Sequence, residues 1–329
     1  MNRCATRIEQ DARAKTLIAP ERLLNAMEPA MRRAATVVPE DVLCALRNSV
    51  DHKSTESGRL HLLTSLENFA ASAAEDGLVC TDTGWPCYYL VVGDHVELVG
   101  GWSQLDGLAA EAVRRCTDRA KLRPTMVHPL TRQSLIGNVG QGFPTVATRF
   151  DSTVEGIRVI AVPKGGGGEV FGSFYRSLLT ADGLPGVYKF IIDCFRDSTY
   201  SGRTCPPNII GIGIGGTPDV CMTLAKQAAV LRLVGDRHLD PQVAAMEVEL
   251  LDAFNDMGVG PMGCGGVTAA LDVHIETAAT HTAAMGVAFN AQCHIGRRAV
   301  ARVTGEDQIL WEEDPDWFGR ELPVAGRPA

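Results

Sequence analysis

Residues 209–217 read Ile-Ile-Gly-Ile-Gly-Ile-Gly-Gly-Thr, a short apolar strand pattern that runs directly into a glycine turn. The residues that follow, 219–233, have the apolar spacing of a helix. A strand, a tight turn and a helix in this order are typical of α/β proteins. We therefore expect an α/β fold built around this segment.

The glycine turn itself allows three interpretations. Its spacing, G-x-G-x-G-G, differs from the dinucleotide fingerprint G-x-G-x-x-G, and Asp236 only loosely matches the acidic residue expected about 20 positions later. An anion held by backbone N–H groups at a helix N-terminus is a more general possibility, which the glycine run 164–168 shares with a lysine added. The third interpretation is structural, a tight turn beneath packed elements.

Away from this segment, helices fill the front of the chain and alternate with strands behind it. Helical patterns cover 18–31, 42–50, 58–75, 106–121, 219–233 and 241–257. Strand patterns cover 88–92, 145–150, 154–162, 209–214, 271–275 and 285–289, while 188–195 fits either state. We expect a mixed α/β domain over 1–305, with a helical N-terminal layer at about 18–79 packed on an α/β remainder at about 80–305. A surface tail is expected over 306–329.

Composition excludes several classes of protein. The chain has 329 residues, 45% of them hydrophobic and 21% charged, which is too apolar for a disordered protein. A net charge of −8 argues against a nucleic-acid partner, whose binding rests on Lys and Arg. No apolar run approaches the ~20 residues of a membrane span, so no membrane partner is expected. The first residues lack the apolar core of a secretory signal, so we expect a cytoplasmic protein with reduced thiols.

Three of the ten cysteines stand in unusual settings. Cys80 precedes a polar turn, Cys205 precedes two prolines, and Cys293 follows a predicted strand. No C-x-x-C pair is present, so zinc-finger and thioredoxin sites lack their main support. Three thiolates from distant segments could hold an iron–sulfur cluster with one iron left open as a Lewis acid. The alternative is that these cysteines are small packing residues.

Several segments, in one order along the chain, resemble the N-terminal or α part of class I fumarases and L-tartrate dehydratases. These proteins are iron–sulfur hydro-lyases. The matching segments carry glycine turns, cysteines or charged residues, and they span about 18–305. They are Cys80-Thr81-Asp82-Thr83-Gly84, Leu122-Arg123-Pro124, Lys164-Gly165-Gly166-Gly167, Cys205-Pro206-Pro207, 211–216, 257–266 and 270–276.

The resemblance implies a [4Fe–4S] cluster held by Cys80, Cys205 and Cys293. It also implies that Asp82 protonates the leaving hydroxyl and that His281, twelve residues before the third cysteine, contacts the substrate. Without the resemblance, Asp82 reads as a helix cap and His281 as a core histidine. The chemistry is consistent with the implied roles. Hydroxide is a poor leaving group, and its departure is assisted when an acid protonates the hydroxyl and an open iron coordinates it.

The substrate implied is a small 2-hydroxy dicarboxylic acid of the malate/fumarate or tartrate type. Arg123 would bind one of its carboxylates in a bidentate manner. A glycine-rich run would line the same pocket, namely Lys164, Gly165, Gly166 and Gly167.

Two features of the sequence bear on this assignment. Thr81 stands where the family usually has Gln, and Trp85 and Pro86 replace a smaller, polar continuation, which favours a changed substrate as an alternative. The family's general base and further cationic residues come from a β part, which we expect here as a separate β subunit in a hetero-oligomer. A non-catalytic cluster-binding subunit and a dehydrogenase remain as further alternatives.

Overall fold

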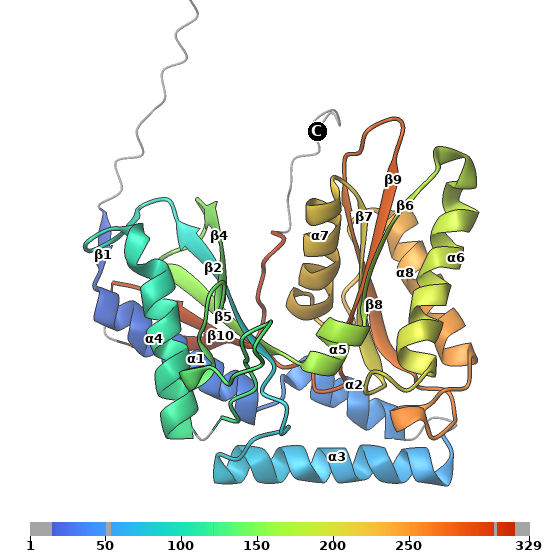
Figure 1. Ribbon diagram of the computed structural model, residues 1–329, viewed down its shortest axis with the longest axis horizontal. Coiled ribbons are helices and arrows are strands. Elements are labelled where there is room, and N and C mark those ends of the chain that lie inside the picture. The colour runs from blue at the N-terminus through green and yellow to red at the C-terminus, as the bar shows by residue number, and fades with distance from the viewer. Residues whose placement is uncertain (1–14, 51–53, 121, 306–307, 320–329) are drawn as a thin grey trace, which may run out of the picture.

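The computed structural model describes residues 15–50, 54–120, 122–305 and 308–319, and it contains two α/β bodies side by side with two helices beneath them (Figure 1). Each body is built on its own sheet, so the expected mixed α/β fold is confirmed. Within these ranges, no helix combines the length and the hydropathy that crossing a bilayer requires.

The first body contains a five-stranded sheet. Its strands are β2 (Trp85–Gly93), β4 (Thr145–Asp151), β5 (Ile157–Lys164), β10 (Ala299–Val303) and β11 (Ile309–Glu312). The order is β11-β10-β5-β2-β4, in which β2 runs parallel to β4 and antiparallel to β5. Helices α1 (Pro20–Thr36) and α4 (Leu105–Ala120) cover one face of this sheet.

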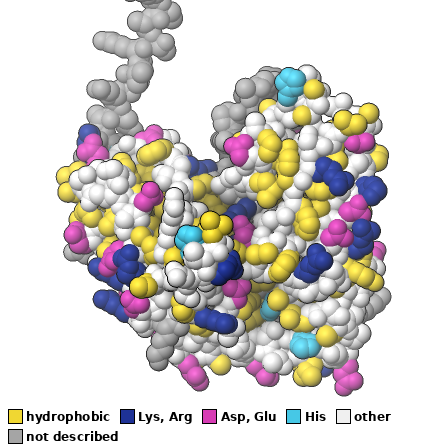
Figure 2. Space-filling model, in the orientation of Figure 1, with side chains coloured by type: hydrophobic (Ala, Val, Ile, Leu, Met, Phe, Trp, Pro, Cys, Tyr) yellow, Lys and Arg dark blue, Asp and Glu magenta, His cyan; other side chains and the backbone are white. Residues whose placement is uncertain are grey.

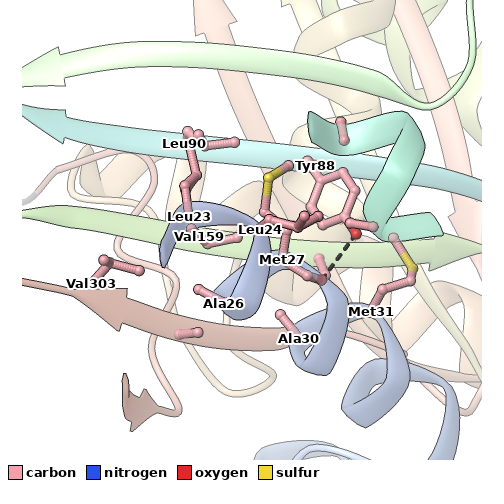
Figure 3. Packing of buried hydrophobic residues seen from close by; sticks show 14 of the residues in the cluster. Leu23, Leu24, Ala26, Met27, Ala30, Met31, Tyr88, Leu90, Val159 and Val303 are labelled. Atoms are coloured by element: carbon pink, nitrogen blue, oxygen red, sulfur yellow. Dashed lines mark hydrogen bonds between the residues drawn. The ribbon is translucent and has the colours of Figure 1, made fainter. Parts of the chain in front are cut away.

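Helix α1 shows why this layer forms. Its buried residues recur at helical spacing and present Leu23 and Met27 to Leu90 of β2 and Val159 of β5 (Figure 3). The hydroxyl of Tyr88 donates to the carbonyl of Met27 at 3.0 Å, which satisfies a polar group inside the core. Each fully buried Leu or Met side chain contributes about 1.5–3 kcal/mol.

The second body contains a four-stranded sheet. Its strands are β6 (Ser173–Leu178), β7 (Asn208–Gly215), β8 (Ala270–Ala278) and β9 (Met285–Gln292), in the order β6-β9-β7-β8. Its helices are α6 (Gly183–Phe195), α7 (Pro218–Leu231) and α8 (Pro241–Asp256). Helices α6 and α8 share one core cluster with this sheet, and α7 packs on the other face.

The alternating Ile and Gly residues of β7 fit this arrangement. Ile210 and Ile212 belong to the cluster shared with α6 and α8, while the glycines between them face α7. A Cβ on Gly211 would lie 2.0 Å from the carbonyl oxygen of Ala225, and one on Gly213 would lie 2.1 Å from another α7 carbonyl. The glycines therefore let α7 approach the strand closely, so packing accounts for the pattern.

The remaining elements connect the two bodies. Helices α2 (Glu40–Val50) and α3 (Glu56–Glu75) lie beneath them, and α5 (Gly166–Phe171) lies between them (Figure 1). A small parallel pair is formed by β1 (Thr16–Ile18) and β3 (Val96–Leu98). The short helical turns are η1 (Trp102–Gln104), η2 (Ile136–Asn138), η3 (Thr180–Asp182), η4 (Arg196–Tyr200) and η5 (Pro261–Gly263).

The structure adds elements that the sequence patterns did not predict, namely α5, β1, β3, β6 and β10. It also decides one segment that was left open and changes the expected tail. Residues 188–195 are helical, because their buried positions follow helical spacing against the second sheet. The expected surface tail is partly built into the fold: β11 extends the first sheet, and Trp317 is only 8% exposed and packs edge-on against Tyr89. Residues 306–307 and 320–329 of that tail lie outside the described ranges.

Candidate functional site

The three predicted cysteines lie together although they come from three loops. Cys80 follows α3, Cys205 precedes β7, and Cys293 follows β9. Cys80 and Cys293 pack against the same apolar cluster, and the backbone N–H of His294 donates to the carbonyl of Cys205 at 3.3 Å. Cys205 is exposed, yet desolvation by nearby atoms, together with the charges of Cys293 and Cys80, raises its pKa to about 11. The thiols are therefore close enough to act on one another.

A buried asparagine braces two of these loops against each other. The amide nitrogen of Asn208, which is fully buried, donates to the carbonyl of Cys205 at 3.2 Å and to that of Gln292 at 3.1 Å. Its amide oxygen accepts from the hydroxyls of Thr199 and Thr204, each at 2.8 Å. One side chain thus fixes the Cys205 loop to the residue before Cys293.

Asp82 is held beside the cysteines by backbone contacts. Its Oδ2 accepts from the N–H of Gly166 at 2.6 Å, and its own N–H lies 3.4 Å from Sγ of Cys80. The carbonyl of Asp82 accepts from Nη1 of Arg297 at 2.6 Å. No hydrogen bond from the described residues reaches Oδ1, so this oxygen is open to a ligand.

The glycine run matters here because a larger residue would collide with the acid. A Cβ on Gly166 would lie 3.2 Å from Oδ2 of Asp82. One on Gly165 would lie 3.6 Å from the same oxygen and 3.9 Å from Sγ of Cys293. Gly167 faces the carbonyl of Arg203 at 3.4 Å. The backbone of this turn therefore lies against Asp82 and close to Cys293.

Lys164 is buried between the glycine turn and β9. Its side chain is fully buried, and Nζ donates to the carbonyl of Ala291 at 2.5 Å and lies 3.8 Å from Glu169. Burial lowers the pKa of Lys164 to about 8, against the opposing effect of Glu169. The ammonium therefore braces the end of β5 against β9.

Arg123 lies on a neighbouring segment and is exposed. Its carbonyl accepts from the amide of Asn138 at 3.1 Å, and Thr125 nearby donates to the carbonyl of Gly84 at 3.3 Å. These bonds hold the segment against the turn that carries Asp82. Among the residues that the structure describes, no carboxylate pairs with the guanidinium of Arg123.

His281 is not brought to the cysteines within one chain. It is exposed in the loop between β8 and β9, where Ala283 donates its N–H to Nδ1 at 3.2 Å. That loop lies at the end of β9 opposite Cys293 (Figure 1). A strand of this length separates the two residues by roughly 25 Å at ~3.3 Å per residue.

The residues that depart from the family pattern are placed as follows. Trp85 and Pro86 pair with Lys164 and Pro163 across the first sheet, and Trp85 packs against an apolar cluster. Cys87 is fully buried in that cluster, so it is a packing residue as expected. Thr81 is exposed and precedes Asp82 in the chain.

Sequence reasoning passed over Asn208 and Arg297 as site residues. The adjacent pair Arg297-Arg298 was visible after Cys293, but a pair of arginines does not reveal which one enters the site. Asn208 had no local signal, because its partners lie on loops that are distant in sequence.

The donor set fits an iron–sulfur cluster better than a single metal ion. In the described ranges, no three His, Cys, Asp or Glu side chains form a group that could hold one ion. Three thiolates on separate loops need not converge on one point in a cluster, because each binds a different iron. On the face drawn in Figure 2, basic and acidic side chains are interspersed rather than gathered into one basic patch.

Known proteins match this chain over most of its length. It matches the family described as fumarate hydratase (Fumerase) over residues 24–302. It is 38% identical over 273 residues to the "Putative L(+)-tartrate dehydratase subunit alpha" of Methanocaldococcus jannaschii, covering 83% of this chain and 94% of that protein. It is 31% identical over 270 residues to the L(+)-tartrate dehydratase subunit alpha of Escherichia coli strain UTI89, covering 82% and 86%. The matched range includes all three cysteine loops, so the chain belongs to the fumarate hydratase family and is a hydro-lyase.

Proposed function

We propose that this chain is the α subunit of a [4Fe–4S]-dependent hydro-lyase. It would reversibly dehydrate a small 2-hydroxy dicarboxylic acid of the malate/fumarate or tartrate type. The observation that carries this proposal is the meeting of Cys80, Cys205 and Cys293 beside Asp82 and the turn at Gly165 and Gly166. The relatives named as tartrate dehydratase α subunits support it.

The three thiolates would hold the cluster, which supplies Lewis acidity toward the substrate hydroxyl when bound. Asp82 would give a proton from Oδ1 to the departing hydroxyl, while the Gly166 N–H keeps the carboxyl oriented through Oδ2. Arg123, with its unpaired and exposed guanidinium, would bind a substrate carboxylate. The turn at 165–167 would exclude side chains from the space that the substrate needs.

A β subunit would complete the site. The relatives are named subunit alpha, and the family's general base is expected on the β part. Large apolar side chains are exposed on the segment that follows Arg123 and at the end of α5: Leu130 and Ile136 are each 87% exposed and Phe171 is 47% exposed. We expect the partner to cover these residues, because exposed apolar groups around a site are typical of an interface. The assembly would be a hetero-oligomer.

His281 could contact substrate only from another chain of that assembly, because β9 separates it from Cys293 of its own chain. The nine described cysteines are all free thiols, which supports a reducing compartment such as the cytoplasm. Thr81, exposed beside Asp82, favours a diverged hydroxy acid as the second candidate substrate class.

The test is anaerobic co-purification with the β subunit, followed by iron and sulfide analysis and an absorbance assay for alkene formation from malate and tartrate isomers. We expect about four irons per α chain and turnover of one of these acids. Cys205→Ala should lose the cluster, whereas Cys264→Ser, a nearby cysteine outside the three, should keep it. A full cluster in the Cys205→Ala protein would contradict the assigned ligands. Four irons with no turnover of any hydroxy acid would support the non-catalytic alternative.

A further inference from the structure

Arg297 is the largest fully buried side chain of the described residues, at 1% exposure. It follows Cys293 by four positions, in the loop between β9 and β10. A guanidinium remains charged at every physiological pH, so burial without a counter-ion is costly. The groups around Arg297 therefore indicate which negative charge it balances.

The other buried arginines each pair with a carboxylate. Arg232 lies 2.7 Å from Glu247, and Arg298, the next residue along the chain, lies 2.6 Å from Asp41. Arg297 has no carboxylate within 4.0 Å among the described residues. Its one hydrogen bond is from Nη1 to the carbonyl of Asp82, and Nε has no partner.

The guanidinium points into the proposed cluster site. The position that a Cβ would take on Gly165 lies 3.1 Å from Nη2 of Arg297, 3.6 Å from Oδ2 of Asp82 and 3.9 Å from Sγ of Cys293. Arg297 therefore faces the space between the acid and the third cysteine. An anion that binds in this space would supply the missing counter-charge.

His294 does not add a second cation to this space. Its ring is buried and packs against Phe69, with ring centroids 5.9 Å apart, so it belongs to the apolar layer behind the cysteines. Lys164 is the other cation close by, and it already has Glu169 and a backbone carbonyl as partners. Arg297 is thus the buried cation of this site that lacks a partner in the described part of the chain.

We propose that Arg297 is a positioning residue that balances the negative charge of the thiolate-bound cluster and holds the backbone of Asp82 beside it. This inference rests on the proposed function, because the anion it invokes is the cluster. A fixed positive charge next to a cluster stabilises its reduced form and raises its reduction potential. The same charge, left without its anion, destabilises the cluster-free chain.

The first test is an EPR-monitored redox titration of the assembled enzyme without substrate. We expect Arg297→Met to lower the ratio of reduced to oxidised cluster at a given potential at least tenfold. This corresponds to a fall of 59 mV in the one-electron reduction potential. Arg297→Lys, which keeps the charge, should restore most of that ratio. Arg302→Gln serves as the control, because it removes an arginine of β10 that pairs with Glu312 of β11. This variant should leave the ratio unchanged.

The second test compares urea unfolding of the cluster-free chain. Because Arg297 lacks an anion in that state, Arg297→Met should unfold at the same or a higher urea concentration than the wild type, while the cluster-loaded variant loses iron faster. If cluster-free Arg297→Met does not fold, Arg297 is required for the fold itself, and the proposal is overturned.

Other results would also overturn it. An unchanged potential in Arg297→Met with a tenfold higher KM for the hydroxy acid would place the guanidinium on the substrate instead. An unchanged potential with unchanged KM would remove Arg297 from the site. If the wild-type assembly binds no iron, the proposed function itself fails, and this outcome is visible before any variant is compared.

Discussion

Asp82 shows how much a single residue depends on its backbone neighbours. One carboxylate oxygen accepts the Gly166 N–H, and the residue's own carbonyl accepts from Arg297. The acid is therefore held in one orientation before any substrate arrives. Such preorganisation is what general acid catalysis requires, because the proton must lie within hydrogen-bond reach of the leaving group.

The corresponding variant is Asp82→Asn, which can still accept from Gly166 through its amide oxygen but cannot give up a proton as a carboxylic acid can. We expect iron content equal to wild type and a fall in kcat of about 10²–10⁴-fold. Iron analysis and steady-state kinetics on the same preparation check this. Unchanged turnover would remove Asp82 from its role as proton donor.

Asn208 is the residue whose loss should separate the cysteine loops. Asn208→Ala leaves two hydroxyls and two carbonyls without their partner, and we expect a loss of about 2–4 kcal/mol in unfolding free energy together with incomplete cluster loading. Urea unfolding and iron analysis measure the two effects.

Asn138→Ala is the matched control for this prediction. Asn138 is also buried and also makes several backbone hydrogen bonds, but it braces the segment that carries Arg123. It should lose similar stability, retain its iron and show a raised KM. Equal iron loss in both variants would mean that cluster loading follows overall stability and not the Asn208 brace.

At the scale of elements, the contact between β7 and α7 decides the second body. Gly211→Ala would bring a methyl group to 2.0 Å from a helix carbonyl, so strand and helix must separate. We expect a loss of at least 1–3 kcal/mol in unfolding free energy, typical of overpacking. Gly107→Ala, where α4 has nothing within 4 Å of the added carbon, should instead gain up to about 1 kcal/mol. If both variants change the unfolding free energy by the same small amount, close packing does not account for the β7 glycines, and a ligand-binding role becomes the better explanation.

Strand β8 carries a group that should make stability depend on pH. Burial raises the pKa of the Glu276 carboxyl to about 7, although Arg232 acts in the opposite direction. Between about pH 4.5 and 7 the folded chain holds a proton at Glu276 that the unfolded chain has lost. This contribution to stability is therefore present at low pH and lost as the pH rises, by on the order of 3 kcal/mol.

Glu276→Gln removes this titration. We expect the difference in unfolding free energy between variant and wild type to grow in the variant's favour from pH 4.5 to above 7, as urea unfolding at several pH values would measure. Glu67→Gln, on the exposed surface of α3, should show no such trend. A difference that is constant with pH would show that Glu276 ionises in the folded chain as freely as in the unfolded one.

At the scale of the whole molecule, the site exists only because the two bodies meet. Asp82 leads into β2 of the first sheet, whereas Cys205 and Cys293 border β7 and β9 of the second. The far face of the first sheet packs against the end of α7 through a shared apolar cluster, which also contains Trp317. The site geometry is therefore a property of this junction and not of either sheet.

The position of His281 leads to a prediction about the assembly. If His281 serves the site of another copy, as proposed above, His281→Ala should keep its iron and lose turnover. Mixing Asp82→Asn chains with His281→Ala chains during assembly should then restore turnover above the sum of the two variants alone, since some sites receive both intact residues. No recovery on mixing, with His281→Ala inactive alone, would contradict action between copies.

The sequence by itself determined the mixed α/β class, the helices other than α5 and α6, about half of the strands and the family, and it named the three cysteines and the acid after the first of them as candidates. These features depend on local periodicity, on turn chemistry and on motifs whose spacing is written along the chain. The glycine run at 165–167 was visible as a turn, but whether it holds an anion or only packs closely stayed open.

Only the tertiary structure decided the rest. It buried Lys164 beneath the glycine turn, placed His281 at the far end of β9, made residues 188–195 helical and added β11 to the first sheet. It also left Arg297 buried without a carboxylate among the described residues, whereas Arg298 pairs with Asp41. The physical reason is that burial, pairing and the end of a strand at which a loop falls depend on neighbours far away in sequence, which no local pattern records.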